Sequence, residues 1–233
     1  MLYITQPTYL PWIGYFSFLH KAKEIVFLDD VQFARRSWQQ RNKIYYQDSY
    51  KYLTVPVIKK GRRDQKIKEV EIFDKEFYKK HLNIIELTYK KFPYFKSTFS
   101  KLVSLNHKIK ELNYLSEINI LLIEAICEIL KIDLKYSKSS DLDIKATRSS
   151  KLAQICKIKI YDKLMSNEGS KKYMTEDFDI FKKNKIELYF FKYQTIKYTQ
   201  LTKKFIKDLS ILDLIFNEGP ESINIIKKGL ISI

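Results

Sequence analysis

The chain has 233 residues, of which 45% are hydrophobic and only five are glycine and five proline. This composition indicates one large or two small folded domains with a substantial core, and it excludes a disordered or low-complexity chain. The 43 lysines and arginines outnumber 27 acidic residues and give a formal net charge of +16, which favours partners that carry phosphate.

The charge of the chain indicates which partners to expect, and its apolar runs indicate where the protein is located. Nucleotide sugars, ATP, RNA and an anionic membrane face all carry phosphate, but the lysines are spread along most of the chain, as in a generally lysine-rich composition. No apolar run approaches the roughly 20 residues of a spanning helix, and the N-terminus lacks a signal-peptide pattern. Cys127 and Cys156 are isolated, as is usual in a reducing compartment. We therefore expect a cytoplasmic protein without a transmembrane segment.

The first 57 residues have the clearest pattern. A short apolar strand, 2–4, leads into a turn that Pro7 and Pro11 make rigid. Apolar side chains at helical spacing follow, and a second apolar strand, 25–28, ends at Asp29-Asp30. This order predicts a strand, a tight turn, a helix and a strand. The two acids then lie at the carboxyl end of a strand, where open α/β sheets bind ligands.

The middle of the chain changes from strand to helix. A third strand is expected over 50–57 and a short one around 70–72. Three helices should follow, one from Asp74 to the residue before Pro93, one over 96–105 and one over 112–130. Residues 74–131 are therefore predicted to form an α-helical insertion or subdomain.

The last third returns to alternating strands and helices. The expected elements are a strand at 134–136, a polar loop at 137–143, a helix at 149–157, a strand at 162–166, a helix capped by Thr175, a strand at 186–193, an apolar helix ending at 217–219 and a terminal helix from Pro220. This rhythm predicts an α/β fold with a mostly parallel, Rossmann-like sheet. The α/β domain would comprise 1–73 and 132–233, interrupted by the helical insertion 74–131.

Five motifs, in the same order, resemble those of a known family. They are QPTYLPWIGYF (6–16), FLDDVQFARRSWQQRNKI (27–44), LTVPV (53–57), SNEGSKKYM (166–174) and LSILDLIFNEG (209–219). Together they resemble the WbqC-like family of bacterial surface-polysaccharide loci over nearly the whole chain. Where many family members carry His before the Gln-Pro pair, this chain carries Thr5. The resemblance implies O-antigen, lipopolysaccharide or capsule biosynthesis, and for one branch the transfer of glycine or another acyl group onto an amino sugar.

Two acids and one amide are the catalytic candidates. Asp29 and Asp30 can act as a general base toward an amine, or hold a ribose, a sugar hydroxyl or Mg²⁺, or simply cap a turn. Gln6 can polarise a carbonyl group. The stretch 166–173 follows a strand and opens a helix, so its backbone N–H groups suit an anion.

Substrate contacts are expected from aromatic, basic and amide side chains. The arginines can clamp a diphosphate while an aromatic ring stacks on a base or sugar, or they can simply form an exposed basic strand. Some of the aromatic residues can equally belong to the core. The expected binding residues are Tyr9, Trp12, Gln32, Arg35, Arg36, Trp38, Arg41, Asn42, Ser166, Asn167, Gly169, Ser170, Tyr173, Gln200, Ser210, Asp213 and Asn217.

The sequence leads to one main hypothesis and two alternatives. The main one is an N-acyl transferase that forms an amide on a nucleotide-linked amino sugar, with ATP or an aminoacyl-tRNA as the source of the activated acyl group. The alternatives are a non-catalytic nucleotide-sugar or RNA-binding module and a glycosyltransferase. The histidines and cysteines show no metal-ligand spacing, so no metal is expected. The sequence is compatible with a homo-oligomer.

Overall fold

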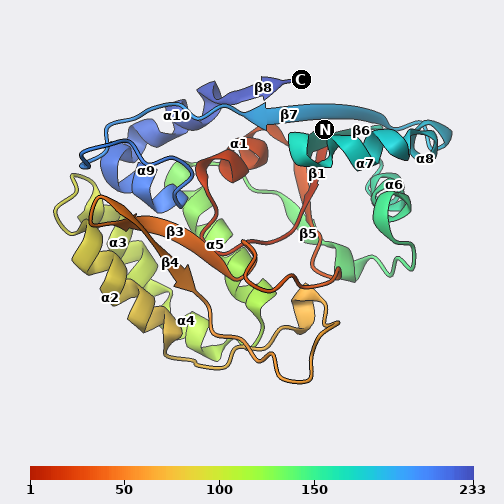
Figure 1. The fold of residues 1–233 in the computed structure, drawn as a ribbon. Coiled ribbons are helices and arrows are strands. Elements are labelled where there is room, and N and C mark those ends of the chain that lie inside the picture. The colour runs from red at the N-terminus through yellow and green to blue at the C-terminus, as the bar shows by residue number, and fades with distance from the viewer.

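The computed structural model describes residues 1–233 and contains a mixed α/β fold built on a six-stranded sheet (Figure 1). The sheet strands are β1 (Leu2–Thr5), β2 (Glu24–Phe27), β5 (Tyr136–Lys138), β6 (Lys163–Asn167), β7 (Glu187–Tyr193) and β8 (Leu230–Ser232). Their order is β5-β2-β1-β6-β7-β8, and all neighbours are parallel except β7 and β8. A mostly parallel sheet, as the sequence predicts, is therefore confirmed.

The chain changes direction across the sheet at β1. From β1 it moves to β2 and β5 on one side, and it then returns to β6, β7 and β8 on the other. In parallel sheets such a reversal leaves a crevice beyond the carboxyl ends of the two strands that meet there. Here those strands are β1 and β6.

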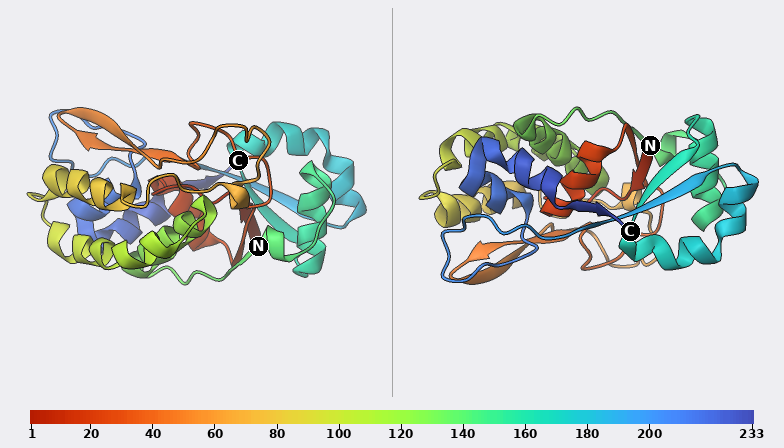
Figure 2. Two further views of the ribbon diagram at one scale, coloured as in Figure 1. Left: turned by 90° about the horizontal axis from the view of Figure 1, so that it is seen from below. Right: turned by 90° about the horizontal axis from the view of Figure 1, so that it is seen from above.

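Helices cover both faces of the sheet (Figures 1 and 2). One face is covered by α1 (Ile13–Lys21), α5 (Leu115–Leu130), α9 (Ile211–Glu218) and α10 (Ser222–Lys228), and the other by α6 (Arg148–Ile158), α7 (Glu168–Glu176) and α8 (Phe178–Lys183). Helices α2 (Phe77–Tyr89), α3 (Phe95–Ser104) and α4 (Asn106–Glu111) lie outside α5. The short 3₁₀ turns are η1 (Ile67–Glu69), η2 (Ser139–Asp141) and η3 (Gly219–Glu221).

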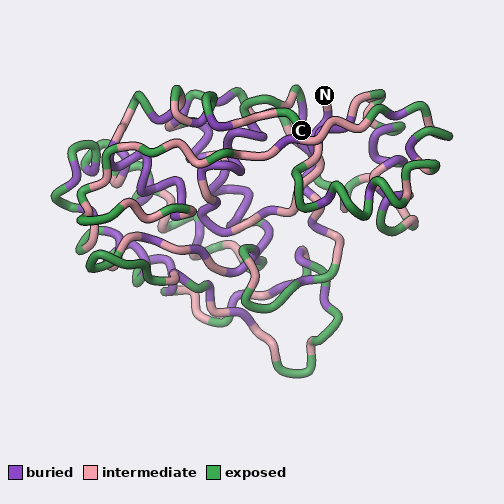
Figure 3. The backbone as a smooth tube through the Cα atoms, turned by 45° about the horizontal axis from the view of Figure 1, so that its top comes forward, coloured by how far each residue is buried: buried purple, intermediate pink, exposed green.

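Alternation along the strands fills two cores. Leu2 and Leu164 pack with α6–α8, whereas their neighbours Tyr3 and Met165 pack with α1, α5 and α9. The larger cluster holds 45 buried residues and includes side chains of the helical block 74–131, so these helices share the main core. Buried segments accordingly run through the interior, and the outer turns are exposed (Figure 3). The division into an α/β domain and a helical subdomain stays a prediction.

A separate hairpin lies beside the sheet. It consists of β3 (Arg41–Tyr46) and β4 (Ser49–Thr54), paired antiparallel. The expected strand at 50–57 is thus shorter and belongs to this hairpin. The expected strand at 70–72 was wrong: Ile72 forms only an isolated bridge with Val57, and its N–H bonds to Asn113 instead of to a neighbouring strand.

Other sequence-based boundaries also need correction. The strand expected at 134–136 begins at Tyr136, and α4 and β8 have no counterpart among the expected elements. Thr175 does not cap a helix. It lies inside α7 and its hydroxyl donates to the carbonyl of Lys171, while Asp177 precedes α8. None of the helices has both the length and the apolar character needed to cross a bilayer.

Candidate functional site

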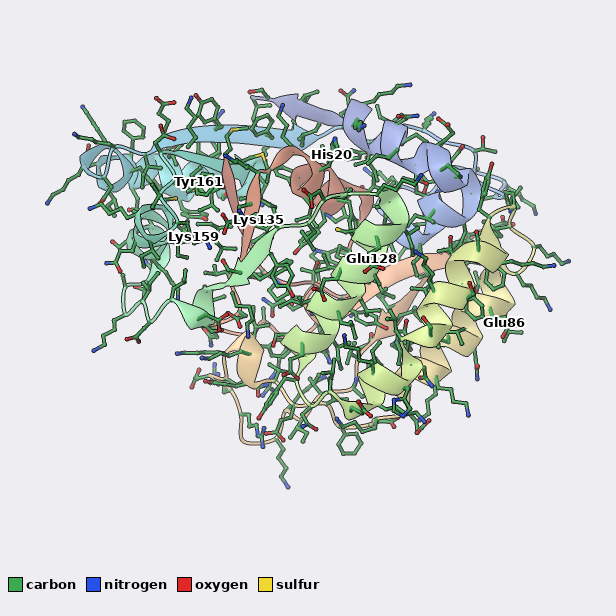
Figure 4. The ribbon with its side chains drawn as sticks, turned by 180° about the vertical axis from the view of Figure 1, so that it is seen from behind. His20, Glu86, Glu128, Lys135, Lys159 and Tyr161 are labelled. Atoms are coloured by element: carbon green, nitrogen blue, oxygen red, sulfur yellow. The ribbon has the colours of Figure 1, made fainter.

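The largest cavity of the molecule lies at the crevice between β1 and β6. Its volume is about 520 Å³, and residues from the carboxyl ends of β1, β6 and β7 line it. Its polar lining consists mainly of hydroxyl and amide groups, from Tyr3, Thr5, Gln6, Thr8, Tyr15, Ser166, Asn167, Ser170, Tyr173 and Tyr193. At the opposite edge of the sheet, Lys159 forms an ion pair with Glu24, and the hydroxyl of Tyr161 donates to the same carboxylate. Lys159 and Tyr161 are labelled in Figure 4.

The loop after β1 is pinned at several points. Buried Asn119 donates to the carbonyls of Pro7 and Gln39, at 3.1 and 2.8 Å, and Asn42 donates to that of Leu10 at 2.8 Å. These bonds hold an irregular turn in which Leu10 has a φ of 42°. The loop thus enters the cavity as a rigid wall.

Two side chains of this loop face the cavity in a fixed arrangement. Gln39 donates to the side-chain oxygen of Gln6 at 2.7 Å, which leaves the Gln6 amide N–H₂ group to donate to a ligand. The indole of Trp12 covers Gly14, where an added Cβ would lie 2.3 Å from the ring. The same indole meets the Tyr193 ring edge to face at 5.6 Å. Trp12 and Tyr193 therefore form an aromatic corner of the cavity.

The turn between β6 and α7 forms the opposite wall. Asn167 caps α7 by accepting a hydrogen bond from the backbone N–H of Ser170 at 3.0 Å. The hydroxyl of Ser170 bonds to Ser166 at 2.6 Å. Glu168 and Gly169, the first residues of the helix, also line the cavity, so its positive end opens there. The sequence-based expectation that a helix opens at this turn is confirmed.

The cavity tyrosines are donors at neutral pH. Burial raises the pKa of Tyr3 and raises that of Tyr15 well above its ordinary value. Burial likewise raises the pKa of Tyr173, and that of Tyr193 to about 12. Each hydroxyl keeps its proton, so none of these groups can serve as a general base. Tyr15 and Tyr193 already donate to the backbone carbonyls of Gln6 and Ile225, which leaves the hydroxyls of Tyr3 and Tyr173 to donate to a ligand.

Two charged residues that line the cavity are not among the site residues expected from the sequence. Glu168 is the one carboxylate among the lining residues, and Lys192 is the one ammonium group. Glu168 lies inside the motif 166–174, between the expected binding residues Asn167 and Gly169. An acidic side chain at this position is a sequence feature that could have identified it as a site residue. Lys192 lies near the end of a strand among apolar and aromatic residues, and nothing local in the sequence marks it.

Asp29 and Asp30 do not line this cavity. Asp29 is buried and accepts hydrogen bonds from Ser139 and Ser140, the latter through both its N–H and its hydroxyl. Asp30 forms an ion pair with Lys151 at 2.5 Å. Burial alone would raise the pKa of Asp30, but hydrogen bonds from Lys151 and Ser139 outweigh it and lower the pKa. The two acids therefore tie the end of β2 to the segment after β5 and to α6, and neither lines the cavity.

Four other expected binding residues gather in a second buried network. Asp213 accepts hydrogen bonds from Tyr198 at 2.6 Å and from Gln200 at 2.8 Å. Asn217 donates to the backbone of Asp213, and Ser210 caps the same helix, α9. These groups fasten the loop before α9 to the core, and none of them lines the cavity.

Asp213 gives a prediction on pH dependence. Burial raises its pKa from 3.8 to about 6 against the opposing hydrogen bonds, so its contribution to stability is present below about pH 4 and is lost as the pH rises through 6. Burial lowers the pKa of His81 from 6.5 to about 4, so its contribution is lost as the pH falls from 6.5 to 4. In the wild type, the pH-dependent contributions of Asp213 and His81 to the free energy of unfolding nearly cancel.

We therefore expect Asp213→Asn and His81→Gln to change the pH dependence of the free energy of unfolding in opposite directions. Without the Asp213 carboxyl, the free energy of unfolding relative to wild type should fall as the pH drops from about 6 to about 4, by up to about 1.4 kcal/mol per pH unit. The His81 variant should show the reverse. Urea unfolding across this range measures both, and parallel profiles for all three proteins would contradict the assignment.

The remaining expected binding residues lie apart from the cavity. Tyr9 is fully buried and its hydroxyl bonds to His81 at 2.8 Å, so it belongs to the core. Gln32 and Arg35 contact the loop 59–64 on the surface, through Asp64 and the carbonyl of Lys59, and Arg36 is exposed. Trp38 and Arg41 lie at the hairpin, on its outer side.

The structure thus brings together one subset of the candidates. Gln6, Trp12, Ser166, Asn167, Gly169, Ser170 and Tyr173 share the cavity, joined by Glu168 and Lys192. No group of three or more His, Cys, Asp or Glu side chains is arranged to hold a metal ion. The site offers hydrogen-bond donors, two aromatic faces and a helix start, which suit a polar ligand that carries a ring and a negative charge.

The whole chain was compared with known proteins. A sequence model of the WbqC-like protein family matches residues 6–225. Over 220 residues the chain is 32% identical to "Uncharacterized protein Rv1507c" of Mycobacterium tuberculosis (strain ATCC 25618 / H37Rv), and the alignment covers 94% of each chain. No solved structure shows a significant match. The extent of these two matches establishes that the chain belongs to the WbqC-like protein family.

Proposed function

We propose that this protein is a cytoplasmic N-acyl transferase that forms an amide on a nucleotide-linked amino sugar during surface-polysaccharide synthesis. The observation that carries the proposal is the cavity at the carboxyl ends of β1 and β6, where the Gln6–Trp12 loop meets the Ser166–Tyr173 turn. Numbered in chain order, the six sheet strands follow the order 3-2-1-4-5-6. Apart from the antiparallel β8, this order matches that of a dinucleotide-binding sheet and supports this placement.

Each wall of the cavity suits one part of such a substrate. The start of α7 suits the diphosphate, because its first N–H groups lack partners within the helix and its dipole favours an anion. Trp12 and Tyr193 suit the face of a sugar ring, and the tyrosine and serine hydroxyls suit its oxygen atoms. Lys192 adds one positive charge.

The reaction requires a base, a carbonyl activator and a leaving group. The nitrogen lone pair of the amino sugar attacks the carbonyl carbon of an activated acyl group, and the Glu168 carboxylate accepts the proton that the nitrogen loses. The Gln6 amide donates to the carbonyl oxygen as negative charge develops there. The bond to the leaving group then breaks. AMP leaves from a glycyl adenylate, which glycine and ATP form with release of pyrophosphate, or the 3′ oxygen of a tRNA leaves and takes up the proton from Glu168. Asp30 acts as a positioning residue, because it holds Lys151 of α6 and the next residue, Leu152, lines the cavity.

Mass spectrometry tests the proposal. In one reaction, the protein is incubated with a nucleotide-linked 4-amino sugar, glycine and ATP. In a second reaction, glycyl-tRNA replaces the glycine and the ATP. A product heavier by one glycyl group, absent when the donor is left out, is the expected result. If no adduct forms with either donor while the sugar nucleotide binds, the protein is a non-catalytic module. If the sugar nucleotide does not bind at all, the cavity assignment is wrong.

A further inference from the structure

The outer face of the β3–β4 hairpin carries aromatic and basic side chains in alternation. Lys43 lies opposite Tyr52 in the antiparallel register, and Arg41 and Tyr50 are on the same face. Trp38, just before β3, extends the row, since its ring lies 6.4 Å from that of Tyr52. On the opposite face, Ile44 and Leu53 are buried in the core, whereas Tyr46 and Lys51 near the turn are exposed. We name these five outer residues the hairpin platform.

Each cation of the platform lies against a ring. The guanidinium of Arg41 is 4.3 Å from the centroid of Tyr52, and the ammonium of Lys43 is 4.7 Å from that of Tyr50 and 5.6 Å from that of Trp38. The rings of Tyr50 and Tyr52 are 5.6 Å apart. The rings thus form a row with positive charges between them.

The platform is open and its charge is not neutralised. Trp38 is 49% exposed and Tyr50 is 46% exposed. Neither Arg41 nor Lys43 has a carboxylate within ion-pair distance. The acid at the hairpin turn, Asp48, is engaged by Lys203 and Tyr45. A cation–π ladder stabilises a hairpin, but that role alone does not require exposed rings.

We propose that the hairpin platform binds single-stranded RNA. Such a strand presents unpaired bases and phosphates in alternation, and the platform presents rings and cations in alternation, as sequence-tolerant single-strand sites do. An anionic membrane is a poorer match, because membrane-surface binding needs apolar side chains that can enter the bilayer, and the platform has no exposed aliphatic residue. The net charge of +16 favours the approach of RNA from any side.

The platform is joined to the cavity through adjacent residues. The backbone carbonyl of Trp38 accepts the N–H of Tyr9, and the side chain of the next residue, Gln39, holds Gln6. The Trp38 end of the platform is therefore hydrogen-bonded to the loop that carries Gln6. A strand that extends past this end, such as the single-stranded acceptor end of a charged tRNA, would run towards the proposed acyl-transfer site. This donor role rests on the proposed function, whereas the binding of RNA does not.

Fluorescence anisotropy with a labelled single-stranded oligouridylate tests the binding. Wild-type protein should bind it more tightly than a duplex RNA of equal length, with an affinity that falls steeply as salt rises. Trp38→Ala and Tyr50→Ala should each weaken binding by about 5-fold to 100-fold. Arg41→Gln and Lys43→Gln should each lower the salt slope by about one. Urea unfolding confirms that each variant is folded.

Matched variants elsewhere serve as controls. Phe73→Ala removes another exposed ring and Lys101→Gln another exposed cation, and both should bind as wild type does. Equal weakening by these controls, no binding to the oligonucleotide, or stronger retention on anionic vesicles or on an anionic polysaccharide would each overturn the proposal. If the protein transfers glycine with ATP but does not bind RNA, the RNA proposal is wrong and the proposed function stands. If it binds RNA but transfers no glycine, the proposed function is wrong and the RNA proposal stands.

Discussion

Replacing Lys151 with methionine is expected to lower the free energy of unfolding at neutral pH by about 3–5 kcal/mol, because it leaves the carboxylate of Asp30 buried without its partner. The two side chains are 7% and 11% exposed and lie 2.5 Å apart. The lowered pKa of Asp30 means that the pair contributes stability above the ordinary carboxyl pKa of 3.8, and that this is lost as the pH falls through the lowered value. Urea denaturation measures the loss.

Two further variants separate the ion pair from general effects of the substitution. Lys163→Met removes one end of an exposed pair, Lys163 with Glu187 at 4.0 Å, and should cost less than about 1 kcal/mol. In the double variant Asp30→Asn with Lys151→Met, no unpaired charge is left, so part of the stability should return. A single Lys151→Met variant as stable as wild type would show that the pair does not hold β2 to α6.

The Glu168→Gln variant is expected to lower kcat for amide formation by about 10²- to 10⁴-fold, because it removes the proposed proton acceptor from the cavity. KM for the sugar nucleotide should change little, since the glutamine keeps the shape of the side chain. Its loss of charge at the start of α7 should cost less than about 1 kcal/mol of stability. Steady-state kinetics with the preferred acyl donor measures both constants.

Glu187→Gln is the matched control for this variant. Glu187 is exposed at the start of β7, on the edge of the sheet away from the cavity, and its replacement should leave both constants unchanged. If Glu168→Gln keeps the kcat of wild type, the proton acceptor is a different group, and Glu168 has at most an electrostatic role.

Local pattern predicted the elements that form the cavity. The apolar strand, the two prolines and the helical spacing after them were enough to place β1 and α1. The Asn-Glu-Gly turn after a strand was enough to place the start of α7. Strand–helix–strand alternation also predicted a mostly parallel sheet, because parallel neighbours require such crossovers. These features depend on residues close in sequence.

The composition of the site depends on contacts between distant residues, which the sequence does not reveal. Asp29-Asp30 ends a buried strand, as expected, but Ser139 and Lys151 arrive from far along the chain and engage the carboxylates. Asp213 is an expected binding residue by sequence, yet Tyr198 and Gln200 donate hydrogen bonds to its carboxylate inside the core. A polar residue in an apolar helix therefore indicates a partner, without showing whether that partner is a substrate or another side chain.

The central claim is that one cavity at the carboxyl ends of β1 and β6 holds the sugar nucleotide. Hydrogen–deuterium exchange with and without a nucleotide-linked amino sugar tests it most directly, because it reports on both walls at once. We expect 6–12 and 166–173 both to be protected, whereas 157–163 at the opposite edge should be unchanged. Protection of only one wall, or protection confined to the hairpin 41–54, would contradict it.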